Sequence, residues 1–181
     1  MAITINGNGT ITGVSVGGLP DGIVDTDMLA AGAATQAKRT YATGEAVQVV
    51  YAEMSSDFGM NSTTETDVGG MTASITLKNA SNNILVDLTF SPYVAGAGAC
   101  QYKTRVYRDT TELYANGNGF YRTGDDLKST SSTIRFLDTG VSDTNSHTYK
   151  MTAQRTSGDD GFSIYASSTL INAITLTEVA A

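Results

Sequence analysis

Apolar and polar residues alternate with a period of two along most of the chain from about Tyr41 onward. Met71–Leu77 alternates without a break, and Ile84–Tyr93 is the strongest apolar run. Because successive side chains of a strand point to opposite faces of a sheet, this period predicts β-strands. The predicted strands are 47–52, 71–77, 84–93, 100–107, 111–115, 120–122, 132–138, 147–155, 162–166 and 170–179.

Turn-forming residues separate these strands, and no amphipathic helical pattern lies between them. Many short strands divided by turn signals are typical of an antiparallel sandwich. We therefore predict an all-β fold, an antiparallel jelly-roll sandwich. The polar stretch Ser55–Gly70 is predicted to be a long exposed loop or irregular edge, and Asn116–Gly119 a hairpin-like turn.

Two strands show which faces are covered. Every second residue from Cys100 to Val106 falls on one face, whereas Lys103 and Arg105 fall on the other, which charge directs to solvent. The terminal strand is apolar on both faces, so we expect the sandwich core to cover one and sister subunits of a trimer to cover the other. Ile174 and Leu176 are assigned to this trimer interface.

The first 40 residues differ from the rest. Asn6–Gly9 separates two short alternating segments, which predicts a hairpin, and a short helix is expected over 28–38. We divide the chain into an N-terminal anchoring arm, 1–40, and a β-sandwich domain, 41–181. A two-stranded hairpin cannot bury its own apolar side chains, so these are expected to anchor the arm on another polypeptide. The predicted anchoring residues are Ile3, Ile5, Ile11, Val14 and Val16.

The charge and composition of the chain argue against nucleic-acid binding and membrane insertion. The formal net charge is -7, and the 11 Lys and Arg form no run. Nucleic-acid affinity depends on clustered cations, so we expect no nucleic-acid partner. No apolar run approaches the roughly 20 residues that span a bilayer, and the N-terminus lacks the pattern of a signal peptide. We expect no membrane insertion.

Candidate catalytic chemistry is sparse. His147, the single histidine, opens a predicted strand without a nucleophile motif, and Cys100, the single cysteine, falls on an apolar strand face. The acidic turns Gly124–Asp126 and Gly158–Gly161 follow no recognised calcium spacing, which favours solvated turns. We expect no catalytic residues, no metal site and no cofactor, and hence a protein that is not an enzyme.

Two parts of the chain resemble virion proteins. The C-terminal stretches 138–140, 147–155, 162–165 and 174–181 resemble the jelly-roll domains at the tips of bacteriophage fibre and head-fibre proteins. Those domains are similar in fold to the C1q and tumour-necrosis-factor group, which assembles as homotrimers. The opening stretches 3–13, 17–22 and 27–30 resemble the N-terminal segment of virion proteins from phages of cyanobacteria and marine bacteria, the end expected to dock on the particle.

This resemblance implies a structural protein of a bacteriophage virion, a homotrimeric fibre or spike anchored through its arm. Its partners would be other virion structural proteins and, where the displayed domain contacts the host, a surface glycan. Two alternatives stay open. One is a capsid decoration protein that stabilises the shell, and the other is a soluble lectin-like module that binds glycans through the regions of Asn61 and Tyr121.

Overall fold

The computed structural model describes residues 4–5, 11–12, 39–95, 100–116, 120–122, 131–158, 161–166 and 171–181. The chain forms two compact units, Met1–Thr40 and Tyr41–Ala181. In the first unit, β1 (Thr4–Ile5) and β2 (Ile11–Thr12) pair antiparallel, which confirms the predicted hairpin. The short helix expected over 28–38 lies outside the described residues.

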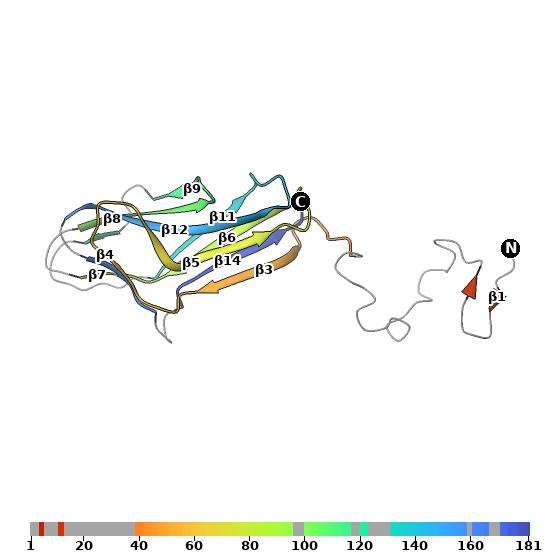
Figure 1. The fold of residues 1–181 in the computed structure, drawn as a ribbon, viewed down its shortest axis with the longest axis horizontal. Helices are drawn as coiled ribbons and strands as arrows, with labels where there is room; N and C mark the ends of the chain where they lie inside the picture. Colours follow the sequence, from red (N-terminus) through yellow and green to blue (C-terminus); the bar gives the residue numbers. More distant parts are fainter. Residues whose placement is uncertain are drawn as a thin grey trace. The chain divides into compact units, whose positions relative to one another are not determined.

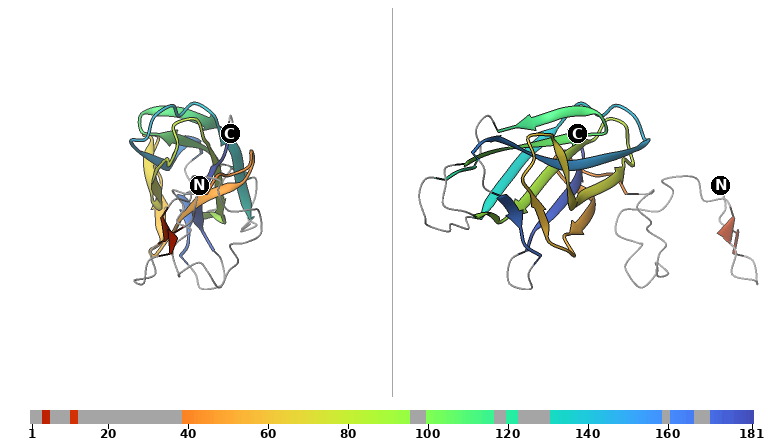
Figure 2. Two further views of the ribbon diagram at one scale, coloured as in Figure 1. Left: turned by 90° about the vertical axis from the view of Figure 1, so that its right-hand side faces the viewer. Right: turned by 60° about the vertical axis from the view of Figure 1, so that its left-hand side comes forward.

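The second unit is a sandwich of two antiparallel sheets, with a small third sheet beside them (Figures 1 and 2). The first sheet has the order β11 (Ser132–Asp138), β6 (Asn83–Phe90), β14 (Ala173–Val179) and β3 (Ala46–Glu53). The second has the order β10 (Phe120–Arg122), β8 (Cys100–Arg108), β12 (Ser146–Ser157) and β5 (Thr66–Thr76), and β9 (Thr111–Ala115) also pairs with β8. The third contains β4 (Phe58–Met60), β13 (Gly161–Ile164) and β7 (Pro92–Ala95).

Successive main strands lie in different large sheets along the chain, except that β9 follows β8 in the same sheet. β3, β6, β11 and β14 belong to the first sheet, and β5, β8, β9 and β12 to the second. Eight strands that cross between two sheets in this way make a jelly roll. The predicted fold class, an all-β antiparallel jelly-roll sandwich, is confirmed. The described residues include no helix long and apolar enough to cross a membrane.

The core lies between the two large sheets and follows the alternation of each strand. β6 places four side chains inward with no exposed surface, and β12 and β14 do the same with their large apolar residues. On β8, Tyr102 and Val106 are fully buried, as the sequence predicted, and the Tyr102 ring lies 4.8 Å from that of Phe162. The inward residues of β6, β12 and β14 are Ile84, Val86, Leu88, Phe90, Tyr149, Met151, Ile174 and Leu176.

A buried carboxylate fastens the terminal strand. Glu178 of β14 accepts hydrogen bonds from the backbone of Lys78 at 2.8 Å and from the side chains of Asn82 and Gln48, both at 2.6 Å. A fully buried carboxylate is tolerated only when its oxygens are satisfied in this way. These bonds join the end of β14 to the β5–β6 turn and to β3.

A second buried carboxylate links the two sheets. Asp138, at the end of β11, accepts hydrogen bonds from Arg108 at 2.6 Å and from the Tyr149 hydroxyl at 2.7 Å. Burial, followed by the hydrogen bond to Asp138, raises the pKa of Tyr149, so its hydroxyl remains a donor. Because β11 belongs to the first sheet and β8 and β12 to the second, this cluster ties the layers together at one end.

The stretch Ser55–Gly70, predicted to be a long exposed loop or irregular edge, contains β4 and the start of β5, which is an edge strand of the second sheet. Phe58 and Met60 pack against the core, and Val68 is fully buried. The Thr, Glu and Asp residues between these positions interrupt the apolar alternation, so these strands cannot be recognised from the sequence. The strands that they pair with lie far along the chain. At Gly70 the backbone has φ +81°, a conformation that favours glycine.

The hairpin expected around Asn116–Gly119 is also not the one observed. β9 and β10 pair with the same strand, β8, so they form one interrupted strand along its edge. Asn116 holds the interruption: its backbone N–H donates to the carbonyl of Thr104, and its side-chain oxygen accepts from the N–H of Thr104, both at 3.1 Å.

Candidate functional site

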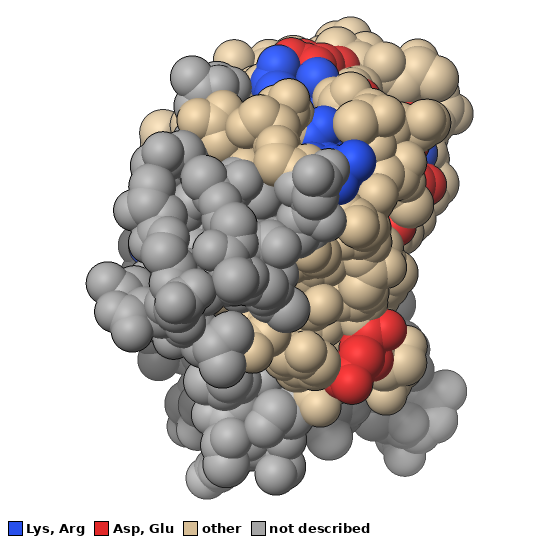
Figure 3. Space-filling view, turned by 90° about the vertical axis from the view of Figure 1, so that its left-hand side faces the viewer, with Lys and Arg blue, Asp and Glu red and all other residues tan. Residues whose placement is uncertain are grey.

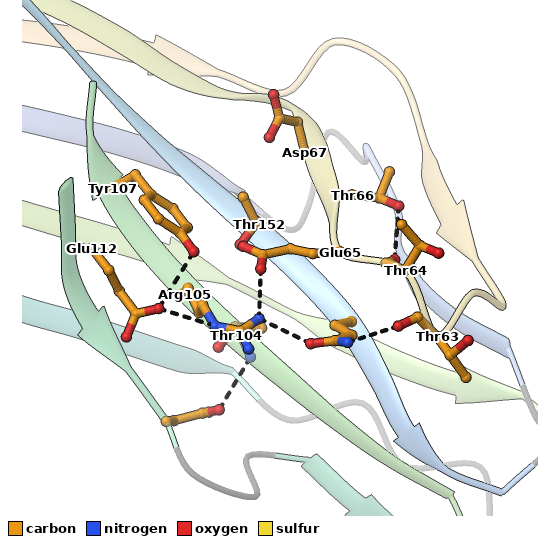
Figure 4. A network of polar contacts seen from close by, with 12 residues as sticks. Thr63, Thr64, Glu65, Thr66, Asp67, Thr104, Arg105, Tyr107, Glu112 and Thr152 are labelled. Atoms are coloured by element: carbon orange, nitrogen blue, oxygen red, sulfur yellow. Dashed lines mark hydrogen bonds and ion pairs between the residues drawn. The ribbon is translucent and has the colours of Figure 1, made fainter. Parts of the chain in front are cut away.

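The outer face of the second sheet carries a connected polar network centred on Arg105 of β8 (Figure 4). Its Nη1 lies 2.9 Å from Glu65 Oε2 and donates to Gln154 Oε1 at 3.1 Å, and its Nε lies 3.1 Å from Glu112 Oε2. Gln154 in turn donates to the carbonyl of Thr63 at 2.7 Å. One guanidinium therefore joins β8, β9, β12 and the segment before β5.

Both carboxylates of the network accept further hydrogen bonds. Thr152 donates to Glu65 Oε1 at 2.6 Å, and the Tyr107 hydroxyl donates to Glu112 Oε2 at 3.3 Å. Burial, followed by the Glu65 carboxylate, raises the pKa of Tyr107 to about 12. The hydroxyl is therefore protonated at neutral pH and acts as a donor.

Side chains of β12 hold the segment 61–67 along its length. Arg155 Nη1 donates to Asn61 Oδ1 at 2.7 Å at one end, and Lys150 Nζ lies 2.9 Å from Asp67 Oδ1 at the other. Between them lie the contacts of Thr63 and Glu65 already described. These cross-strand bonds explain why a stretch of polar residues is ordered against the sheet.

The polar side chains of this face are held in place by ion pairs and hydrogen bonds to one another. Each of its three carboxylates lies within ion-pair distance of Arg105 or Lys150, and Glu65 and Glu112 each accept a further hydrogen bond from a hydroxyl group. These carboxylates are Glu65, Asp67 and Glu112, and Lys103 of β8 lies on the same face by its register with Gln154. Among the described residues, no group of three or more His, Cys, Asp or Glu side chains could hold a metal ion. Such a surface can present hydrogen-bonding groups to a polar ligand.

His147 lies between two carboxylates. Its Nδ1 is 2.8 Å from Asp109 Oδ2, and its Nε2 is 3.1 Å from Asp143 Oδ1. An ionised carboxylate only accepts, so both contacts are hydrogen bonds when the ring is protonated and both of its nitrogens donate. The hydrogen bond to Asp109 raises the pKa of His147. In this arrangement the ring links two loops and has no free nitrogen with which to accept a proton.

The remaining predicted residues fall in different places. Ile174 and Leu176, assigned to a trimer interface, instead lie in the core of a single chain with no exposed surface. The alternation of β14 was predicted correctly, but its inward face is the one that carries these two residues. Ile5 and Ile11 are cross-strand partners in β1 and β2, whereas Ile3, Val14 and Val16 lie outside the described residues.

Other candidates are only partly described. The side chains of Cys100 and Tyr121 and the carboxylates of both acidic turns lie outside the described residues. Asn61 is engaged by Arg155. The sequence analysis missed Glu65 and Glu112; the spacing of Glu65 and Asp67, two residues apart, was the available signal that both face one side of a strand.

Comparison with known proteins gives no family. No known family matches the sequence, and no curated protein matches it. Among solved structures, dimeric latent PorU from Porphyromonas gingivalis has a TM-score of 0.38 at 9% identity, covering 74% of this chain and 13% of that one. The structure of infectious bursal disease virus, Gx strain, has a TM-score of 0.31 at 11% identity, covering 72% of this chain and 35% of that one. Both TM-scores are below 0.5, so neither similarity assigns a family or a function to this chain.

The Arg105 network leads to a stability prediction. Arg105→Met keeps most of the side-chain volume but leaves Glu65 and Glu112 facing each other without a cation. We expect a loss of about 1–3 kcal/mol in the free energy of unfolding, measured in urea. Hydrogen exchange should also speed up at the Arg155 amide, which donates to the carbonyl of Ser62.

The matched control is Arg135→Met. In the single chain the Arg135 side chain is 63% exposed and its Nε lies 3.4 Å from Asp87 Oδ2, so both variants are compared at a protein concentration low enough to keep the chain monomeric. Exposed ion pairs contribute little, so its loss should stay within about 0.5 kcal/mol. Equal effects of the two variants would contradict a central role for Arg105.

The contacts of His147 with Asp109 and Asp143 predict that the stability of the fold depends on pH. A raised His147 pKa stabilises the fold below about pH 6.5, and this contribution is lost as pH rises through the raised value. The pKa of Asp109 is lowered, chiefly by the hydrogen bond to His147, so its contribution holds above about pH 4 and is lost in more acidic solution. We expect the stability advantage over His147→Gln to be largest between about pH 4 and 6.5 and to shrink toward pH 9. Urea unfolding of both proteins across this range measures it; a constant difference would refute the charged cluster.

Proposed function

We propose that this chain is a structural protein of a bacteriophage virion, a homotrimer anchored by residues 1–40 that displays its jelly-roll domain for contact with the host surface. The observation that carries the proposal is the contrast between the two outer sheet faces. One face is the polar network around Arg105. The other carries apolar side chains and threonines beside a single ion pair, Arg135–Asp87.

The second of these faces is the outer side of the first sheet. The strand registers place Leu137, Leu85, Thr177 and Val49 in one continuous row across its four strands. Tyr51 lies in the next row, which also contains Thr175 and the Asp87–Arg135 ion pair. Val49 is 59% exposed, Tyr51 53% and Leu137 49%. Single exposed apolar residues are common, but adjacent ones on one sheet face favour a contact surface.

This face favours self-association as its use. Antiparallel sheets that meet water usually alternate with polar residues, as the second sheet does. Here the outward residues of the central strand, β14, are mainly Thr175, Thr177 and Val179 rather than charged groups. Sister subunits would therefore cover β14 from outside, as inferred from its sequence, but through these residues rather than Ile174 and Leu176. The number three rests on the resemblance of the C-terminal half.

The assembly test uses the whole chain. Light scattering should give three times 18.9 kDa, about 57 kDa. Val49→Asp and Leu137→Asp place charges in the contact surface and should give folded monomers, because an unpaired charge cannot be desolvated there. Thr72→Asp, at an exposed site on the other sheet, is the control and should leave the trimer intact. A monomeric wild-type protein would refute the proposal.

The anchoring role is tested separately by deleting residues 1–24. The jelly roll has its own core, so the deletion should leave its urea unfolding transition unchanged. It should also abolish incorporation into particles, measured by mass spectrometry of purified virions supplied with the variant. Incorporation at the normal level would show that the anchor lies elsewhere, whereas unfolding would show that these residues belong to the core.

A further inference from the structure

The small β4–β13–β7 sheet has one face that no other described strand covers. Its registers place Gly59, Ser163 and Tyr93 side by side across the three strands. The neighbours of Ser163 along β13, Phe162 and Ile164, point the other way and have no exposed surface. The row therefore lies on the outer face of this sheet.

Two tyrosines form an aromatic edge beside this row. The rings of Tyr93 and Tyr165 lie 5.4 Å apart at 60°, edge to face, and Tyr165 is 43% exposed. Among the described residues, no side chain hydrogen-bonds to either hydroxyl group. Tyrosines of this kind offer an apolar ring and a polar tip at the same place.

The glycine in the row is not required by the local fold. Gly59 is exposed, its φ is not in the left-handed region, and an added Cβ would meet only Ser163 Oγ at 3.5 Å, an ordinary contact. Glycine within a strand weakens it and often marks a place where a ligand approaches the backbone closely. Here it leaves a bare stretch of backbone next to the two rings.

The polar groups around this bare backbone are few and suited to hydroxyls. Asp57 accepts a hydrogen bond from the backbone of Ala166 through Oδ1 at 2.8 Å, which holds its carboxylate beside the end of β13. Ser163 supplies a hydroxyl in the row itself. Figure 3 views the domain from the side on which β4 and β7 lie, and most of the described surface there belongs to uncharged residues.

We propose that this surface, defined by Asp57, Gly59, Tyr93, Ser163 and Tyr165, binds a neutral sugar. The apolar face of a pyranose ring would stack on the tyrosines, while its hydroxyls bond Ser163 and Asp57 over Gly59. A carboxylate in the patch and a net charge of -7 disfavour acidic sugars. This names the ligand class of the displayed domain, and it rests on the proposed function for the source of the glycan.

The test is affinity electrophoresis of the full chain in native gels that contain dextran, mannan, galactan or polygalacturonate. Repeated sugars let weak sites act together, so retardation is measurable even where one site binds weakly. We expect retardation by at least one neutral polysaccharide and none by polygalacturonate. Tyr165→Ala should weaken the association by about tenfold or more, as truncation of a central aromatic contact does.

Gly59→Val is the decisive variant, because the structure has room for the side chain and valine favours strands. It should stay folded and lose retardation. Gly69→Val is the matched control, since Gly69 is an exposed strand glycine on β5 whose added Cβ meets nothing within 4 Å. Retardation that survives Gly59→Val, retardation by polygalacturonate alone, or none with any neutral polysaccharide would overturn the proposal.

The molecular mass of the same samples separates the two proposals. A monomer that is retarded and loses retardation in Gly59→Val would keep the sugar site and refute the trimeric virion protein. A trimer that no neutral polysaccharide retards would refute the sugar site alone.

Discussion

The phase of alternation in each strand is the constraint on which the rest of this domain depends. Each strand can place only every second side chain between the two sheets, and the residues that do so form a single core. Once that phase is set, the outward residues are fixed as well. The polar network around Arg105 and the apolar rows around Val49 are thus two results of one packing solution, and a shift of one residue in any strand would exchange core and surface.

The two buried carboxylates, Glu178 and Asp138, fix the strand registers through hydrogen bonds and not through apolar packing. A shift of two residues would keep the same face of a strand inward, whereas Glu178 and Asp138 are satisfied only when several defined donors meet them. Both lie at the boundary between layers or strands. Such groups cost free energy unless every bond forms, so they favour one arrangement over its close alternatives.

The strands that could be predicted from sequence are those whose own alternation is strong, such as 71–77 and 132–138. The predicted strand 84–93 is divided in the structure into β6, which ends at Phe90, and β7, which begins at Pro92 in another sheet. The faces of β8 were also predictable, because Lys103 and Arg105 exclude the alternative. Prediction failed where the structure depends on a contact with another strand. Glu65 is held by Arg105 of β8, and β9 and β10 both pair with β8 and not with each other. For β14, alternation separated Ile174 and Leu176 from their neighbours, but only the full set of strands shows which side faces inward.

The position of β14 has a consequence for how the domain is made. It is the last strand of the jelly roll in the sequence, yet it lies between β3 and β6 and pairs with both along its length. During synthesis, β3 and β6 must wait for more than 80 residues before their shared neighbour emerges. Until then their inward faces and free edges remain exposed, so the first sheet closes late and its folding is governed by contacts distant in sequence. A nascent chain stalled before Ala173 would be prone to aggregation.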